Sequence, residues 1–211
     1  MTSIAIYIEG GGDRANGSAM LRQGFEALLE PQKNAARERR MRWKLVLCGG
    51  RAATFDAFQY ATRAARGEIV GLLVDAEQEV ASAAPDGRMA HLNARDGWNL
   101  EGIASERVHL MTQCMESWIV ADVEALAGFY GPRFHAGALS RRNVLDDEPK
   151  ASVYAALEAA TKATQKGSYG KIRHASEILK RLRPAVIATR CRSFRDFTGW
   201  LDAAITGAGV Q

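Results

Sequence analysis

The chain has 211 residues, of which 47% are hydrophobic and 25% charged, a composition that fits one globular domain with a sizeable core. No apolar run approaches the roughly 18 residues that span a bilayer, and Met1 leads almost directly into the apolar stretch SIAIYI, so we expect neither a membrane segment nor a signal peptide. The net charge of +4 is uneven, because residues 1–140 carry 15 Lys and Arg against 17 Asp and Glu, whereas residues 141–211 carry 13 against 7.

Apolar runs alternate with helical patterns through the first two thirds of the chain. Strands are predicted at residues 3–8, 43–48, 69–75 and 107–113, and helices at residues 17–31, 51–66 and 116–131. This order predicts an α/β fold, with a mostly parallel, Rossmann-like sheet covered by helices. Residues 77–106 are rich in polar and turn residues and are predicted to form a long loop with a functional or mobile role.

The β signal fades after about residue 136. Helices are predicted at residues 149–163, 171–183 and 195–205. We therefore expect an α/β core over residues 1–136 and a basic helical extension over residues 137–211 that packs on it. The positive charge of the extension favours a nucleic-acid partner, although solvated helix faces would give the same balance.

Carboxylates follow the predicted strands. Glu9 and Asp13 come after the first strand, Asp75 and Glu77 end the third, and Glu116 follows the fourth. In an open parallel sheet the carboxyl ends of the strands share one edge, where ligands bind. Helix N-termini would explain Asp13 or Glu116 singly, but several carboxylates together repel one another unless a cation lies among them. Oxygen ligands without His or Cys predict Mg²⁺ or Mn²⁺, as one ion or two.

Basic and aromatic residues complete the candidate site. Lys171 and Arg51 are candidates to stabilise charge at a phosphate, and Arg51 could equally pair with Glu9 or Asp75. The further candidates for nucleic-acid contacts are Lys150, Arg173, His174 and, by stacking on a base, Trp98. The alternative for each lysine is a solvated surface position. The three cysteines match no metal or disulfide spacing, which indicates reduced thiols in a cytoplasmic protein.

The motifs EGGGD (9–13), LLVDAE (72–77), HLMTQCMESWIVAD (109–122) and YGKIRHASEIL (169–179) resemble those of an uncharacterised bacterial family with TOPRIM-like features. The resemblance to TOPRIM nucleases of the overcoming-lysogenization type implies that Glu9, Asp75 and Glu77 bind Mg²⁺ and that Glu9 takes part in proton transfer. It also implies an AAA- or ABC-type ATPase partner in phage defence or DNA repair. Glu77 stands where an Asp is commoner, which loosens its expected geometry.

We therefore predict a metal-dependent nuclease acting on DNA or RNA. Two alternatives stay open: a non-catalytic adaptor or sensor that docks on an ATPase, and a hydrolase of nucleotides or other small phosphates. The sequence does not decide the oligomeric state, and a homodimer is compatible with it.

Overall fold

The computed structural model describes residues 2–11 and 15–207. In this part of the chain four strands form one parallel sheet in the order β2-β1-β3-β4. The strands are β1 (Ser3–Ile8), β2 (Arg42–Leu47), β3 (Ile69–Asp75) and β4 (Val108–Met111). The predicted α/β class and all four strands are confirmed, with β4 shorter than expected.

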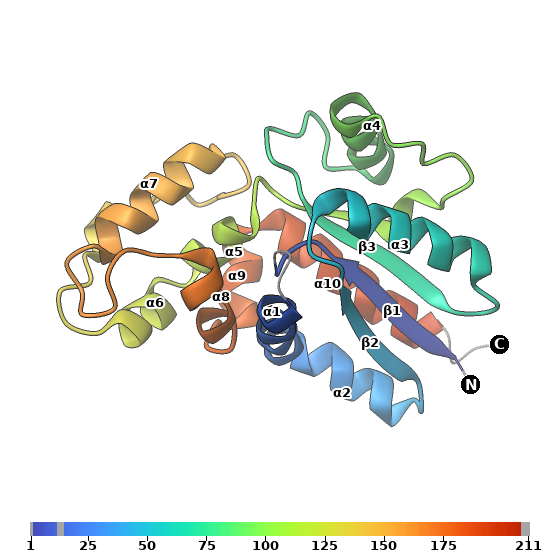
Figure 1. The fold of residues 1–211 in the computed structure, drawn as a ribbon, viewed down its shortest axis with the longest axis horizontal. Coiled ribbons are helices and arrows are strands. Elements are labelled where there is room, and N and C mark those ends of the chain that lie inside the picture. The colour runs from blue at the N-terminus through green and yellow to red at the C-terminus, as the bar shows by residue number, and fades with distance from the viewer. Residues whose placement is uncertain (1, 12–14, 208–211) are drawn as a thin grey trace.

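Helices cover both faces of the sheet (Figure 1). Along β3, Val70, Leu72 and Val74 belong to one buried cluster and Leu73 to the other, as the alternation of a strand requires. The first cluster includes side chains of α3 (Arg51–Ala64) and α4 (Pro85–Asp96). The second includes side chains of α1 (Ala15–Leu28), α2 (Glu30–Glu38) and α10 (Arg192–Gly207).

The remaining helices lie beyond the carboxyl ends of the strands, and Figure 1 shows α6, α7 and α8 at the end of the molecule away from both termini. These helices are α5 (Met115–Ala121), α6 (Val123–Tyr130), α7 (Lys150–Thr161), α8 (Lys171–Leu179) and α9 (Pro184–Arg190), with 3-10 turns at Ser105–Arg107 and Ala136–Ala138. Asp122 separates α5 from α6, because its side chain accepts a hydrogen bond from the Ala125 N–H and caps the second helix. The single helix predicted at 116–131 is therefore two.

The predicted long loop at 77–106 is wrong, because α4 occupies its centre. Pro85 stands in the first helical turn and Gly97 ends the helix in a left-handed conformation. Only Arg88 and Leu92 of this helix are buried, so its sequence has little apolar periodicity. Helices α2 and α9, which carry a proline in the first turn, were likewise not predicted.

One hydrophobic cluster joins the two parts expected on either side of residue 136. It contains Phe25 and Trp118 from the first part and Leu157, Ile178 and Phe197 from the second. The C-terminal helices thus complete the core that supports the edge of the sheet. Within residues 2–11 and 15–207, we find no helix with the length and apolar character needed to cross a membrane.

Candidate functional site

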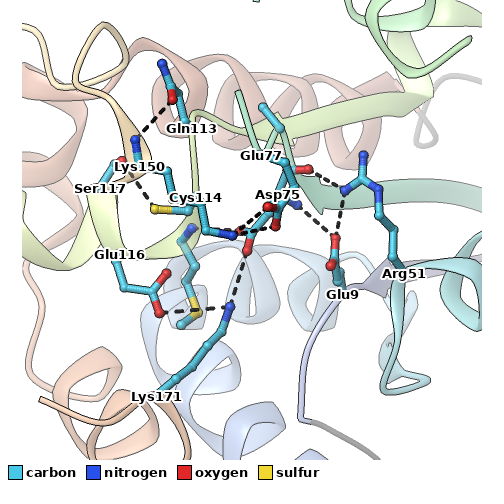
Figure 2. A network of polar contacts seen from close by, with 12 residues as sticks. Glu9, Arg51, Asp75, Glu77, Gln113, Cys114, Glu116, Ser117, Lys150 and Lys171 are labelled. Atoms are coloured by element: carbon cyan, nitrogen blue, oxygen red, sulfur yellow. Dashed lines mark hydrogen bonds and ion pairs between the residues drawn. The ribbon is translucent and has the colours of Figure 1, made fainter. Parts of the chain in front are cut away.

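Three carboxylates meet where β1 and β3 end. Glu9 directly follows β1, Asp75 is the last residue of β3, and Glu77 lies two residues further on. One carboxylate oxygen of each lies within 4.8 Å of the other two, and Figure 2 shows the three side chains gathered between the strand ends. Parallel pairing of β1 with β3 brings both carboxyl ends to one edge and so produces this convergence. We call these residues the carboxylate cluster.

The backbone holds two of these residues in place beyond the strands. The Glu9 N–H donates to the Leu73 carbonyl at 3.0 Å, which extends the pairing of β1 by one residue. Glu77 has a φ of 70°, a left-handed conformation uncommon for residues other than glycine. Its N–H donates to the Gln113 carbonyl at 2.7 Å, which fixes that turn against the segment after β4.

Asp75 is the most deeply buried member of the cluster, with 2% of its surface exposed. Its Oδ1 accepts a hydrogen bond from the Met115 N–H at 2.7 Å, and its Oδ2 accepts one from Lys171 Nζ at 3.2 Å. Burial raises the pKa of Asp75 to about 6, since the charge of Lys171 only partly offsets the burial and the charges of Glu116 and Glu9 add to it.

Arg51, at the start of α3, holds Glu9. Its Nη1 donates to Glu9 Oε2 at 2.9 Å and also to the Asp75 carbonyl, while Nε and Nη2 donate to the two Asp96 oxygens at 2.9 and 2.7 Å. Burial opposes the charge of Arg51, but hydrogen bonding to Asp96 and the charge of Glu9 outweigh it and raise its pKa. Of the roles predicted for Arg51, the structure places it in the pairing with Glu9, which makes it a positioning residue.

Lys150, the first residue of α7, neutralises Glu77. Its Nζ lies 2.6 Å from both oxygens of the Glu77 carboxylate. Its backbone N–H donates to Gln113 Oε1 at 3.1 Å, so Gln113 fixes the positions of both partners through its carbonyl and its side chain. Lys150, predicted to contact nucleic acid, therefore belongs to the carboxylate edge itself.

Lys171, the first residue of α8, lies between two carboxylates (Figure 2). Its Nζ is 3.2 Å from Asp75 Oδ2 and 3.9 Å from Glu116 Oε1. Burial opposes the ammonium charge, but Asp75 and Glu116 outweigh it and raise the pKa of Lys171, which keeps it protonated.

The helix that carries Lys171 is held against α1. Helix α8 packs closely on α1 at Gly24, where a Cβ would lie 3.0 Å from the Leu179 side chain.

Glu116 does not belong to the carboxylate cluster, which corrects its prediction as a fourth metal ligand. It lies across Lys171 from Asp75, is fully buried, and accepts a hydrogen bond from Tyr169 Oη at 3.0 Å. Its Oε2 has no hydrogen-bond partner among the described residues. Burial and the charge of Glu116 together raise the pKa of Tyr169 well above its usual value, so the phenol stays a donor. Asp13 lies outside the described residues.

Two predicted nucleic-acid contacts are corrected by burial. Trp98 stacks on Phe55 with ring centroids 4.0 Å apart and also lies against the Arg51 guanidinium, so no free face remains for a base. His174 is buried with its Nδ1 3.1 Å from Tyr130 Oη and accepting from the Gly170 N–H. Burial, with the charge of Arg173, lowers the pKa of His174. Arg173 is exposed, and its contact with nucleic acid stays a prediction.

Cys114 lies at this edge as a buried, neutral thiol. It is buried, and burial together with the charges of Glu116 and Asp75 raises the pKa of its thiol to about 12. All three cysteines are free thiols, as predicted.

A cavity of about 350 Å³ opens beside the carboxylate cluster. Glu9 and Lys171 stand in its wall. The rest of the wall consists of glycines, apolar residues and one serine from the ends of β1 and β2 and from α1 and α8: Gly10, Gly11, Gly17, Met20, Leu21, Gly49, Ile172 and Ser176. We call it the glycine-lined cavity.

Three residues that hold the site were not predicted: Asp96, Gln113 and Tyr169. Asp96 ends a helix that was not predicted, and Tyr169 reaches Glu116 from a loop 53 residues away, so neither lies at a strand end. Gln113 ends the predicted strand at 107–113, but its side chain is an amide, and only carboxylates at strand ends were considered as ligands.

Residues 8–202 match the family described as Domain of unknown function (DUF4276). No curated protein and no solved structure matches the chain. The expectation of an uncharacterised family is confirmed, whereas the link to TOPRIM proteins stays a prediction. Because the match covers nearly the whole sequence, the chain belongs to the DUF4276 family.

Proposed function

We propose that the chain is a metal-dependent phosphodiesterase acting on nucleic acid, a nuclease that works with an ATPase partner. The observation that carries this proposal is the carboxylate cluster: three carboxylate oxygens within 4.8 Å of one another at the ligand-binding edge of a parallel sheet. The TOPRIM-like motifs support the choice of reaction, and the ATPase partner rests on that resemblance alone.

The carboxylate cluster fits a hard divalent cation. Glu9, Asp75 and Glu77 offer only oxygen ligands, as Mg²⁺ and Mn²⁺ prefer. Such an ion supplies Lewis acidity toward a phosphoryl oxygen and lowers the pKa of bound water. The raised pKa of Asp75 describes the cluster without the ion, where burial and neighbouring carboxylates favour the protonated form.

The chain's own cations divide the remaining work. Lys171 is partly exposed and stands in the wall of the glycine-lined cavity, so it is placed to offset negative charge on a phosphate. Arg51 holds Glu9 through an ion pair, and Lys150 holds Glu77. Glu116 and Tyr169 lie behind Lys171 and keep its ammonium charged and oriented. The basic residues of 141–211 supply the charge that holds a phosphate backbone.

One observation favours the adaptor as a second candidate. Each carboxylate of the cluster already has a protein cation: Arg51 for Glu9, Lys171 for Asp75 and Lys150 for Glu77. These pairs compensate the buried charge without a metal. In an adaptor the same network would only fix the shape of the surface that docks on an ATPase.

Mn²⁺ titration by calorimetry separates the two candidates. The wild type should bind Mn²⁺ saturably, and Glu9→Gln and Asp75→Asn should each remove that binding. Glu79→Gln is the matched control, since Glu79 is exposed, lies two residues from Glu77 and is outside the cluster. The same four proteins are then tested for Mn²⁺-dependent cleavage of DNA and RNA, which Asp75→Asn should abolish. A wild type that neither binds Mn²⁺ nor cleaves would reject the nuclease in favour of the adaptor.

A further inference from the structure

We propose that the glycine-lined cavity binds the base and sugar of one unpaired nucleotide, which makes single-stranded nucleic acid the substrate class. This inference rests on the proposed function, because it assigns the substrate of the same site. The size of the cavity, the mixed chemistry of its wall and the exposed side chains there support this assignment.

The cavity has the size of a small-molecule site. Its volume of about 350 Å³ lies at the lower end of the roughly 300–1,000 Å³ typical of ligand pockets. The base and sugar of one nucleotide have a volume in that range. A paired base could enter only together with the base and backbone of its partner strand, which would not fit. A base inside a duplex must first be unstacked and unpaired, at a cost of a few kcal/mol. An unpaired strand avoids that cost.

Glycines keep the cavity open where the loops after β1 and β2 meet. The Gly10 N–H donates to the Gly49 carbonyl at 3.0 Å, which ties the two loops together. Gly10 and Gly11 have φ values of 132° and 95°, which side chains rarely allow. A Cβ at Gly11 would also lie 2.5 Å from the backbone of Ser18. Gly10 and Gly11 therefore combine a special backbone with a wall that a ligand can approach closely.

The wall of the cavity combines two kinds of chemistry. Glu9 and Lys171 belong to the carboxylate edge, where Lys171 offers an ammonium group to an anion. The wall also carries the apolar side chains of Met20, Leu21 and Ile172. A nucleotide combines an anionic phosphate with a flat ring whose faces are apolar, and so matches both kinds of lining. Its phosphate then falls beside the carboxylate cluster, where cleavage is proposed.

The exposed apolar residues point to the same place. Among the described residues the exposed large hydrophobic side chains are Met20, Tyr60 and Ile172, with 43%, 77% and 76% of their surface exposed. Two of the three stand on the wall of this one cavity, from helices α1 and α8. Exposed apolar side chains gathered at a cavity mark a binding surface more often than scattered ones do.

The test measures binding of fluorescein-labelled oligo(dT), oligo(rU) and a duplex of equal length by anisotropy, with Ca²⁺ in place of Mn²⁺ to prevent turnover. We expect a single strand to bind about tenfold more tightly than the duplex. Ile172→Asp should weaken single-strand binding about tenfold, because a charge replaces an apolar contact beside the base. The matched control is Tyr60→Asp, which alters an equally exposed apolar residue on α3 and should change the affinity less than about twofold.

The outcomes separate this inference from the proposed function. Unchanged binding by Ile172→Asp, or equal binding of duplex and single strand, would overturn the cavity assignment even if Mn²⁺ titration and cleavage succeed. If free dTMP competes as strongly as unlabelled oligo(dT), the assignment of single-stranded nucleic acid as the substrate would be overturned in favour of a small phosphate substrate. A wild type that does not bind Mn²⁺ would reject the nuclease. The difference in single-strand affinity between Ile172→Asp and Tyr60→Asp would still show whether the cavity binds nucleic acid.

Discussion

At the scale of single residues, Asp75 combines burial with two close carboxylates, and this combination gives a pH dependence. In the folded protein its pKa is about 6, against about 3.9 in an unfolded chain. Between these values the folded state binds more protons than the unfolded state, so the free energy of unfolding falls as the pH rises. The shift of about two units corresponds to about 3 kcal/mol.

Asp75→Asn should remove this dependence. An Asn can still accept the hydrogen bond from the Met115 N–H, but it does not ionise. The stability of the wild type relative to the variant should fall by about 2 kcal/mol between pH 4 and pH 7, measured by urea unfolding with EDTA present, since the unfolded carboxyl is already about half ionised at pH 4. Asp56→Asn, at an exposed position of α3, should give no such trend. Parallel pH profiles for wild type and Asp75→Asn would contradict the account of the site.

The sequence predicts single residues of the site only where one local rule applies. Glu9, Asp75 and Glu77 follow buried strands, and the geometry of a parallel sheet is enough to bring strand ends together. Glu116 also follows a strand, but it lies in the first turn of α5, on the far side of Lys171 from Asp75, which the strand rule does not predict. Trp98 was misjudged because it directly follows α4, a mostly polar helix that was not predicted. The end of α4 places Trp98 against Phe55 of α3.

At the scale of elements, contact between β3 and α10 depends on a glycine. A Cβ at Gly71 would lie 2.5 Å from Trp200 Cη2, so α10 can approach the sheet only because that side chain is absent. Gly71→Ala should therefore lower the free energy of unfolding by about 1–3 kcal/mol, the usual cost of overpacking a core. Thermal or urea unfolding of wild type and variant measures this difference.

Gly199→Ala is the control for this contact. Gly199 precedes Trp200 in α10, and a Cβ there meets nothing within 4 Å. In a helix, alanine in place of glycine should raise stability by up to about 1 kcal/mol. The two substitutions, on either side of the same contact, should thus change the free energy of unfolding in opposite directions. A Gly71→Ala variant as stable as the wild type would show that α10 does not pack on β3 in this way.

The elements that the sequence predicts well are those with strong periodicity. The run from Ile69 to Val74 is apolar throughout, as a strand covered on both faces requires. Helix α4 buries only Arg88 and Leu92, so nothing in its pattern separates it from a polar loop. The break at Asp122 was missed because the helical pattern continues across it, although an Asp at this position can cap a new helix locally. Its bonds with Arg183 form only once the distant segment at 183 packs beside it.

At the scale of the whole molecule, the C-terminal helices take part in one core with the sheet. Helix α10 packs on β4 and α2, and α8 packs on α1. Two of the cations of the site, Lys150 and Lys171, also come from the part after residue 136. The expected division into a core and an extension therefore describes the distribution of strands and charge, while the hydrophobic cluster and the site each need both parts.

A fragment of residues 1–136 should consequently fail to fold by itself. It would expose Phe25, Leu28 and Trp118, which are buried in the shared cluster, and burial of such side chains contributes about 1.5–3 kcal/mol each. Because domains are stable by only about 5–15 kcal/mol, the fragment should show no cooperative thermal transition by circular dichroism. The full chain should show a single one.

Adding a fragment of residues 137–211 should restore both folding and the site. The mixture should regain a cooperative transition and, since the refolded sheet brings Glu9, Asp75 and Glu77 together again, the Mn²⁺ affinity of the intact chain. A fragment of 1–136 that unfolds cooperatively and binds Mn²⁺ alone would show instead that the carboxylate cluster is complete without its two lysines. In that event Lys150 and Lys171 would serve the substrate rather than the carboxylates, because compensation of the buried charge would no longer require them.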